Sequence, residues 1–135
     1  MKALEEAIYR TLDDDTTLSG MAPGGVWRSV APASATGTVV VFDMLSSADD
    51  YVLAQRATTT CLYTIKAVTP GTSSAPAWNA AGRIDELLSD QDITLTGAVL
   101  MSCRRAQLIS LVETDGGEMY QHVGGIYTFM SQETP

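Results

Sequence analysis

Apolar side chains recur at helical spacing in two separate segments of the chain. In residues 2–15 they would line one face of a helix. That face consists of Leu4, Ala7, Ile8, Thr11 and Leu12. The three acids Asp13, Asp14 and Asp15 are unfavourable at the C-terminus of a helix because the macrodipole is negative there. We therefore expect this helix to end at these acids, followed by one more turn and a loop.

The second helical segment, residues 77–90, has the more regular apolar stripe. The stripe consists of Ala77, Ala80, Ala81, Ile84, Leu87 and Leu88. The opposite, polar face consists of Arg83, Asp85, Glu86 and Asp90. Ser74 precedes the segment as a candidate cap, and Pro76 lies close to the first helical position. Both features are typical of a helix N-terminus.

Five segments are predicted to be strands: residues 26–31, 38–45, 58–68, 98–113 and 118–130. The third alternates, with Cys61, Tyr63 and Ile65 on one side and Thr60, Thr64 and Lys66 on the other. The sequence TDGG at 114–117 lies between the last two segments, and Asp-Gly or Gly-Gly at such a place is a strong hairpin signal.

Three further stretches read as connections or ends. Residues 46–57 (SSADDYVLAQRA) are polar enough to form a long hairpin connection, and residues 69–76 (TPGTSSAP) form a turn. Residues 131–135 are expected to be a loose tail.

The predicted elements follow one another as helix, strands, helix, strands, with hairpins inside each group of strands. This order predicts an α+β fold, in which an antiparallel sheet of about four to five strands has two helices packed on one face. The chain has 135 residues and no internal repeat, so residues 1–135 are expected to form one domain.

Composition narrows the classes of function. The formal net charge is −8, which argues against a groove that grips nucleic acid phosphates. No apolar run approaches the roughly 20 residues that a membrane-spanning helix needs. Cys61 and Cys103 lie in strand-like segments without CxxC spacing, and we expect both to be buried, reduced thiols.

His122, the only histidine, lies in YQHVGGIYTFM at 120–130. The sequence contains no phosphate loop, nucleophile elbow or HExxH motif that would give this histidine a catalytic role. We therefore expect a half-buried strand residue whose ring is hydrogen-bonded by a neighbour. Gly124 and Gly125 beside it would allow a bulge or a close approach of backbones.

Metal and cofactor sites find no support in the sequence. The acidic runs at 13–15 and 49–50 lack the glycine and glutamate spacing of a calcium loop. Zinc would need Cys61, Cys103 and His122 to converge, and the alternation of the strands argues against it. Trp27 and Trp78 lack the interleaved basic residues of a base-stacking platform, so they are expected to be core or interface anchors. We expect no cofactor and no metal.

The order of several phrases resembles one protein family. These phrases are ALEEAIYRTLDDDTTLSG, GGVWRSVAPASATGTVVVF, YTIKAVTPG, AAGRIDELLSD and SCRRAQLISLVETDGGEMYQHVGGIYTFM. Together they span roughly residues 3–130 and resemble the small tail-completion or tail-terminator proteins of long-tailed bacteriophages and related prophages. The chain departs from that pattern at Gly37 and Thr38, at the entry to that strand, where the family often has proline and a hydrophobic residue.

The resemblance implies a structural role in the virion and no enzymatic activity. Such proteins form a ring, usually a hexamer, at the head-proximal end of the tail tube. The ring stops polymerisation of the tail tube protein and presents a surface to the head connector. Double-stranded DNA passes through the opening of the ring. The protein would then be assembled in the host cytoplasm and remain at the head–tail junction. An acidic ring fits this role because it repels phosphates.

Partner contacts are expected at the two longest polar connections, residues 46–57 and 69–76. Arg104 and Arg105 are adjacent, so they should point to opposite faces of a strand, as edge charges that block pairing or as contacts to an acidic partner. The predicted interface residues are Asp49, Asp50, Arg56, Arg104 and Arg105.

Three other functions remain open from the sequence. The first is a head-completion or connector protein of the phage neck. The second is a small α+β enzyme or ligand-binding domain that uses His122 and a nearby carboxylate. The third is a monomeric interaction module of the host.

Overall fold

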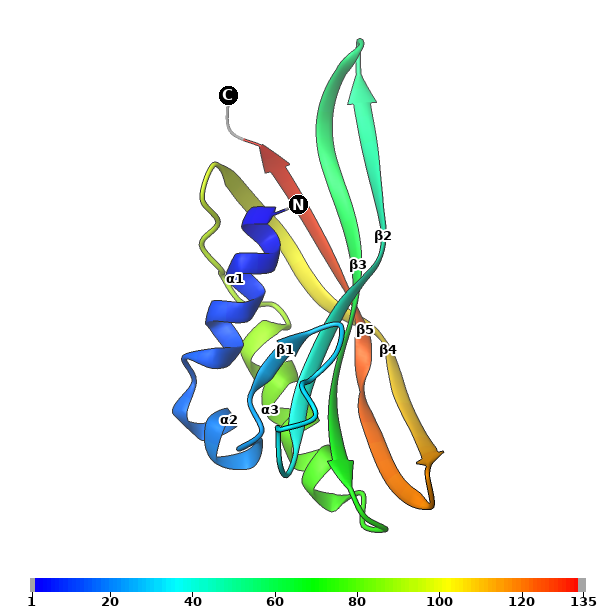
Figure 1. Cartoon of the computed structure of the whole chain (residues 1–135). Coiled ribbons are helices and arrows are strands. Elements are labelled where there is room, and N and C mark those ends of the chain that lie inside the picture. The colour runs from blue at the N-terminus through cyan, green and yellow to red at the C-terminus, as the bar shows by residue number, and fades with distance from the viewer. Residues whose placement is uncertain (1, 134–135) are drawn as a thin grey trace.

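The computed structural model describes residues 2–133 and has the helix–strand–helix–strand order expected of an α+β protein (Figure 1). Its elements are α1 (Lys2–Asp13), α2 (Thr16–Met21), β1 (Val26–Arg28), β2 (Val39–Val52), β3 (Gln55–Pro70), α3 (Ala75–Leu88), β4 (Ala98–Asp115) and β5 (Glu118–Glu133). The predicted fold class is confirmed, and α2 is a third, short helix where a single turn was expected. No helix within the described residues is long and apolar enough to cross a membrane.

The five strands form one sheet in the order β1-β2-β3-β5-β4. The β2–β3, β3–β5 and β4–β5 pairs are antiparallel, as predicted. β1 is the exception, because it pairs in parallel with β2, with Trp27 opposite Val41. Parallel pairing requires the chain to return to the end of the sheet at which β1 began, and a tight hairpin turn cannot do this. The connection here, residues 29–38, is long enough.

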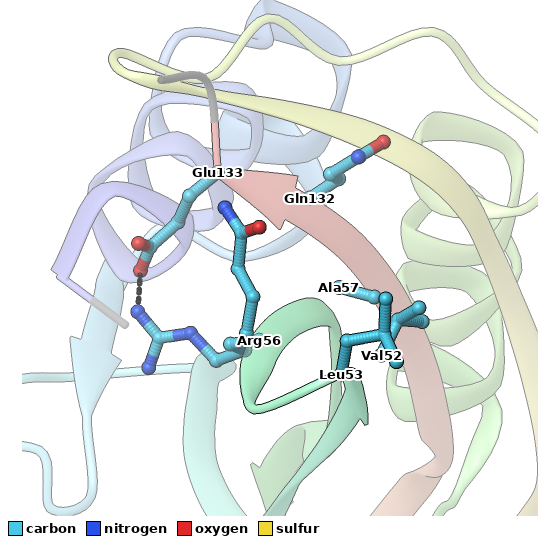
Figure 2. A pocket seen from close by; sticks show the side chains of 7 residues that line it. Val52, Leu53, Arg56, Ala57, Gln132 and Glu133 are labelled. Carbon is cyan, nitrogen blue, oxygen red and sulfur yellow. Dashed lines mark ion pairs between the residues drawn. The ribbon is translucent and has the colours of Figure 1, made fainter.

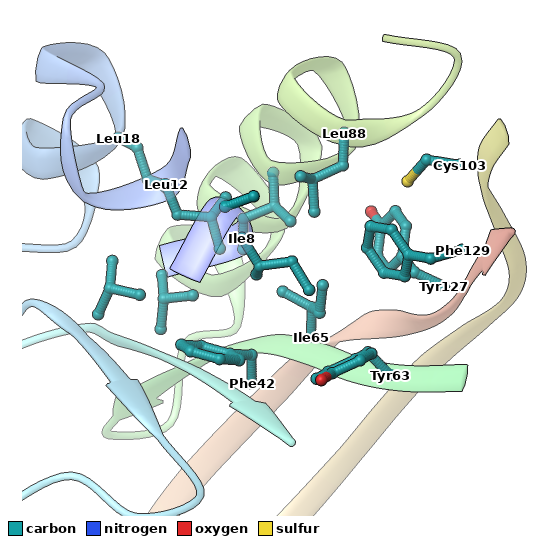
Figure 3. Close-up of a cluster of buried hydrophobic side chains, with 14 of the residues drawn as sticks. Ile8, Leu12, Leu18, Phe42, Tyr63, Ile65, Leu88, Cys103, Tyr127 and Phe129 are labelled. Carbon is teal, nitrogen blue, oxygen red and sulfur yellow. The ribbon is translucent and has the colours of Figure 1, made fainter. Parts of the chain in front are cut away.

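α1 and α3 cover one face of the sheet, and the core lies between these two layers (Figures 1 and 3). α1 contributes Leu4, Ala7, Ile8 and Leu12, as its spacing predicted, and α3 contributes Ala77, Ala80, Ala81, Ile84 and Leu88. On the sheet, Tyr63 and Phe129 meet edge to face with ring centroids 5.7 Å apart. The alternation predicted for the third strand is confirmed, because Cys61, Tyr63 and Ile65 are buried in this core.

Asp15 joins the helices to one another at the place where α1 was expected to end. Its Oδ2 accepts a hydrogen bond from the backbone N–H of Leu18 at 2.8 Å, which caps α2. Its carboxylate also receives two hydrogen bonds from Arg83 on α3, at 2.9 Å from Nε and 2.7 Å from Nη2. Arg83 was predicted on the solvent face of its helix, and the structure places it against α2 instead.

Several boundaries differ from those predicted. Residues 46–57 are not a loop: β2 continues to Val52 and β3 begins at Gln55, so most of the segment is paired strand. Residues 131–133 are not a loose tail but the end of β5, with Ser131 fully buried opposite Thr59. Residues 134–135 of the predicted tail lie outside the described residues. The helix predicted at 77–90 runs from Ala75 to Leu88.

The glycines beside His122 serve a close approach of backbones. A Cβ on Gly124 would meet the backbone of Ile65 and Lys66 on β3, and one on Gly125 would meet Arg105 and Gln107 on β4. β5 stays in regular register with β3 through both glycines. The bulge lies on β4 instead, where the register shifts between Arg105 and Gln107.

Candidate assembly site on the projecting hairpin

The outer part of the β2–β3 hairpin projects past the rest of the molecule, and we call residues 44–58 the arm (Figure 1). β5 pairs with β3 only from Thr59 onward, so most of the arm is a two-stranded ribbon. From Asp43 to Val52 every residue of β2 is exposed. No helix covers this ribbon, so its side chains contribute little to the core.

The tip of the arm is apolar and has a strained backbone. Tyr51, Val52 and Leu53 are all exposed, and Leu53 is 94% exposed. Leu53 and Ala54 form the turn with φ values of 53° and 69°. Two positive φ values suit a hairpin turn, but such turns normally use Asn-Gly, and the left-handed region costs other L-residues about 1–2 kcal/mol each. A strained turn that exposes a leucine is better explained by a contact than by folding.

The structure brings together Asp49 and Arg56, two of the predicted interface residues. Asp49 Oδ1 accepts a hydrogen bond from Thr59 Oγ1 at 2.8 Å, and its Oδ2 lies 3.9 Å from Arg56 Nη1. Arg56 Nη2 also lies 2.6 Å from Oε1 of Glu133 at the end of β5 (Figure 2). The hydrogen bond with Glu133 raises the pKa of Arg56. Asp50 is in register with Thr58, one position from the Asp49–Thr59 pair, and so lies on the other face of the ribbon.

A hollow of about 570 Å³ opens between the tip of the arm and the end of β5. Figure 2 shows Val52 and Leu53 on one side of it and Gln132 and Glu133 on the other. Its lining is mainly apolar on the arm and polar on β5, with Arg56 reaching across. The tip and this hollow together form a surface that another chain could contact.

Arg104 and Arg105 lie on β4, which β3 and β5 separate from β2 in the sheet. Arg104 is in register with Thr128 and Arg105 with Tyr127, so they start from opposite faces of the strand. Each pairs with an aspartate near the C-terminal end of α3: Arg104 Nε lies 2.9 Å from Asp90 Oδ1 and Arg105 Nη1 lies 3.9 Å from Asp85 Oδ2. β4 is an edge strand, which fits the interpretation of edge charges.

His122 is more buried than predicted, at 8% exposed, and it lies on the sheet face away from the helices. Its Nε2 is 3.0 Å from Oε1 of Glu113 on β4. Its buried Nδ1 has no hydrogen-bond partner among the described residues. Cys61 and Cys103 are buried on the helix side, so the three candidate zinc ligands do not converge. Within residues 2–133 no group of three His, Cys, Asp or Glu side chains is placed to hold a metal ion.

Burial favours the neutral form of three ionisable side chains of the core. Burial raises the pKa of the Cys103 thiol to about 12, so it is not a nucleophile near neutral pH. Burial likewise raises the pKa of Tyr63 and Tyr127. Both cysteines are free and buried, as predicted.

Sequence patterns did not reveal the arm as a pair of strands. Its residues include SSADD, which lack β-branched side chains, and its turn has no Gly, Pro or Asn. The apolar triplet Tyr51, Val52 and Leu53 inside a polar stretch was the available signal. The other predicted partner loop, residues 69–76, is shorter in the structure: only residues 71–74 lie between β3 and α3.

No protein-family model and no curated protein matches the sequence. Among solved structures, the fold is similar to a chain from the virion of a native gene transfer agent particle, with a TM-score of 0.82 at 19% identity. The likeness covers 97% of this chain and 96% of that chain. A second solved structure has a TM-score of 0.61 at 12% identity and covers 99% of this chain and 95% of that chain. At these identities the likeness shows a shared fold over nearly the whole of each chain.

Proposed function

We propose that this protein is a structural component of a phage-type virion that acts as a tail terminator. The observation that carries the proposal is the fold likeness, at a TM-score of 0.82 over nearly both full chains, to a chain of a virion particle. The order of sequence phrases that resembles tail-terminator proteins supports the same role. In this role the protein caps the tail tube and joins it to the head connector, at the head–tail junction, after assembly in the host cytoplasm.

The arm supports assembly into a closed ring, which we take to be a hexamer. A ring is built from a heterologous interface, in which one surface of a subunit contacts a different surface of the next. A projecting ribbon with Tyr51, Val52 and Leu53 exposed at its tip suits one half of such an interface. Asp49, Asp50 and Arg56 flank the tip as polar contacts, and Arg104 and Arg105 are the proposed contacts on the edge strand.

The net charge of −8 per chain supports passage of DNA without binding. Repeated around a ring, acidic subunits produce a negative potential that repels phosphates. Double-stranded DNA would therefore slide through the opening rather than adhere to its wall.

A second candidate function is supported by the contact between His122 and Glu113, which border a hollow on the open face of the sheet. This geometry would suit a small enzyme or ligand-binding domain. The substitution His122→Ala separates the two functions, because it should leave assembly intact if the protein is structural.

The experiment that tests the proposed role is mass measurement with negative-stain imaging of the protein alone, with tail tubes and with head connectors. A terminator forms a ring on the end of the tube and stops its elongation. Binding to connectors without binding to tubes would indicate a head-completion protein of the neck instead. A monomer under all three conditions would contradict both assignments.

A further inference from the structure

The sheet face away from the helices carries a second hollow, of about 810 Å³, at the end where β4 and β5 meet their turn. One wall is the loop at residues 29–37. The floor consists of strand residues of β2 and β3, and the other wall is the end of the β4–β5 hairpin. We call this hollow the acidic groove. It is separate from the arm, which extends from the opposite end of β2.

The floor of the acidic groove is apolar except for Lys66. Val39 is in register with Val68, which is in turn opposite His122, so one row of side chains crosses three strands. In the next row of this face Gly124 contributes no side chain opposite Lys66. The loop wall adds Val30, which is 77% exposed, beside small residues and Pro32. An extended segment with apolar side chains could lie along this floor and remove it from water.

The opposite wall carries three carboxylates, from Glu113, Asp115 and Glu118. Glu113 Oε1 contacts His122 Nε2, and Glu118 Oε2 accepts a hydrogen bond from the Tyr120 hydroxyl at 2.9 Å. Neither contact supplies a fixed positive charge. Lys66 is the single Lys or Arg side chain in the lining. The wall is therefore negative and complementary to a cationic partner.

A second copy of this chain is a poor source of that cation. Five arginines of the described chain already form ion pairs with its own carboxylates: Arg28, Arg56, Arg83, Arg104 and Arg105. Arg10 donates to the Thr94 carbonyl, and Lys2 lies near Glu6. Six of the eight Lys and Arg side chains are thus in ion pairs within the chain, and Lys66 lies inside the groove itself. With a net charge of −8, the chain favours a different, basic protein as its partner.

We propose that the acidic groove binds an extended segment of a different protein, in which arginine or lysine residues alternate with apolar ones. The apolar side chains lie on Val39 and Val68, and the cations meet Glu113, Asp115 and Glu118. The inference does not rest on ring formation, because the groove is complete within one chain.

The test is a titration of isotope-labelled protein with a synthetic peptide of alternating arginine and valine, followed by NMR. We expect the peptide to shift the resonances of residues 29–41 and 113–122, and the affinity to fall with added salt. A peptide with glutamate in place of arginine is the control ligand and should not bind.

Two variants of equal charge test the location. The triple variant Glu113→Gln, Asp115→Asn, Glu118→Gln should bind the peptide about ten-fold more weakly, as expected for the loss of three exposed ion pairs. The control variant Asp13→Asn, Asp14→Asn, Asp92→Asn has the same net charge with the groove unchanged, and should bind like the wild type.

Three outcomes would overturn the proposal. They are equal weakening in both triple variants, no shift in the groove at millimolar peptide, and shifts confined to another surface. Groove resonances that move as the protein itself is concentrated, without peptide, would identify a second copy as the occupant and would also overturn it. A failed ring assay with a positive titration would refute the terminator role alone.

Discussion

The inner and outer parts of the β2–β3 hairpin belong to the same two strands but have opposite environments. On the inner part, Phe42, Tyr63 and Ile65 are buried beneath the helices. On the outer part, Tyr51, Val52 and Leu53 are exposed, although they are equally apolar. The comparison shows that neighbouring layers, rather than strand pairing, decide burial. It also separates residues needed for folding from residues whose apolar character must have another use.

The largest expected difference between the two parts comes from truncating one large apolar side chain in each. Phe42→Ala removes a ring of the inner part that is only 2% exposed in the core, and should lower the free energy of unfolding by about 3–5 kcal/mol. Leu53→Ala at the tip of the arm should change it by less than about 0.5 kcal/mol. Urea denaturation followed by circular dichroism measures both. Similar losses in the two variants would mean that the arm is part of the cooperative core.

Gly124→Ala should be the next most damaging change, because its Cβ would meet the backbone of β3. We expect a loss of about 1–3 kcal/mol from the displaced strands. Gly82→Ala on α3 is the matched control, since no atom lies within 4 Å of an added Cβ there, and it should stabilise the helix by about 0.5–1 kcal/mol. Thermal unfolding of the two variants should therefore shift in opposite directions, and a tolerated Gly124→Ala would contradict the close approach.

A smaller effect is expected at the contact that ties α3 to α2. The hydrogen bond from Arg83 holds the pKa of Asp15 below its usual value. As the pH falls, the unfolded state therefore takes up a proton on Asp15 before the folded state does. The stabilisation from the Arg83–Asp15 contact is fully present above about pH 4 and is lost as the pH falls further. Arg83→Met should cost about 1 kcal/mol near neutral pH.

The cost of Arg83→Met should shrink as the pH falls through the acidic range, which denaturation series at several pH values will show. Lys2→Met is the control, because Lys2 and Glu6 are both exposed and such pairs contribute little. A cost that does not depend on pH would mean that Arg83 stabilises the helices by packing alone.

The helices and the last hairpin could be predicted from the sequence because their signals are local. The stripe ending at Leu88 and the Gly-Gly turn at 116–117 each depend on neighbouring residues alone. The parallel pairing of β1 could not be predicted, since it depends on where residues 29–38 place the chain. The ion pair between Arg83 and Asp15 likewise joins residues far apart in sequence, so helical spacing alone placed Arg83 in solvent.

The candidate site was predicted only in part. Asp49 and Arg56 were expected to face partners, and they lie together on the arm. The ribbon itself was missed, because its length depends on cross-strand pairing and its turn uses Leu53 and Ala54 instead of residues that favour positive φ. Glu113 beside His122 is a cross-strand contact, which a reading of each strand alone does not reveal.

The smallest expected change in stability is an increase. Replacing the turn by Leu53→Asn, Ala54→Gly supplies the residues that a turn with two positive φ values favours. Relief of the two strained φ values is partly offset by the greater freedom of glycine in the unfolded chain, so we expect a net gain of about 0.5 kcal/mol, measured by thermal unfolding. A loss of stability would show that Leu53 packs within its own chain, and the strain at the tip would then need no external contact to explain it.

Assembly of this same double variant tests whether the tip of the arm forms the interface between subunits. Its particle mass and negative-stain images should be compared with those of the wild type, each mixed with tail tubes. We expect rings on tube ends for the wild type and folded monomers, without rings, for the double variant. Rings of equal abundance in both samples would contradict the claim that the tip of the arm forms the interface between subunits.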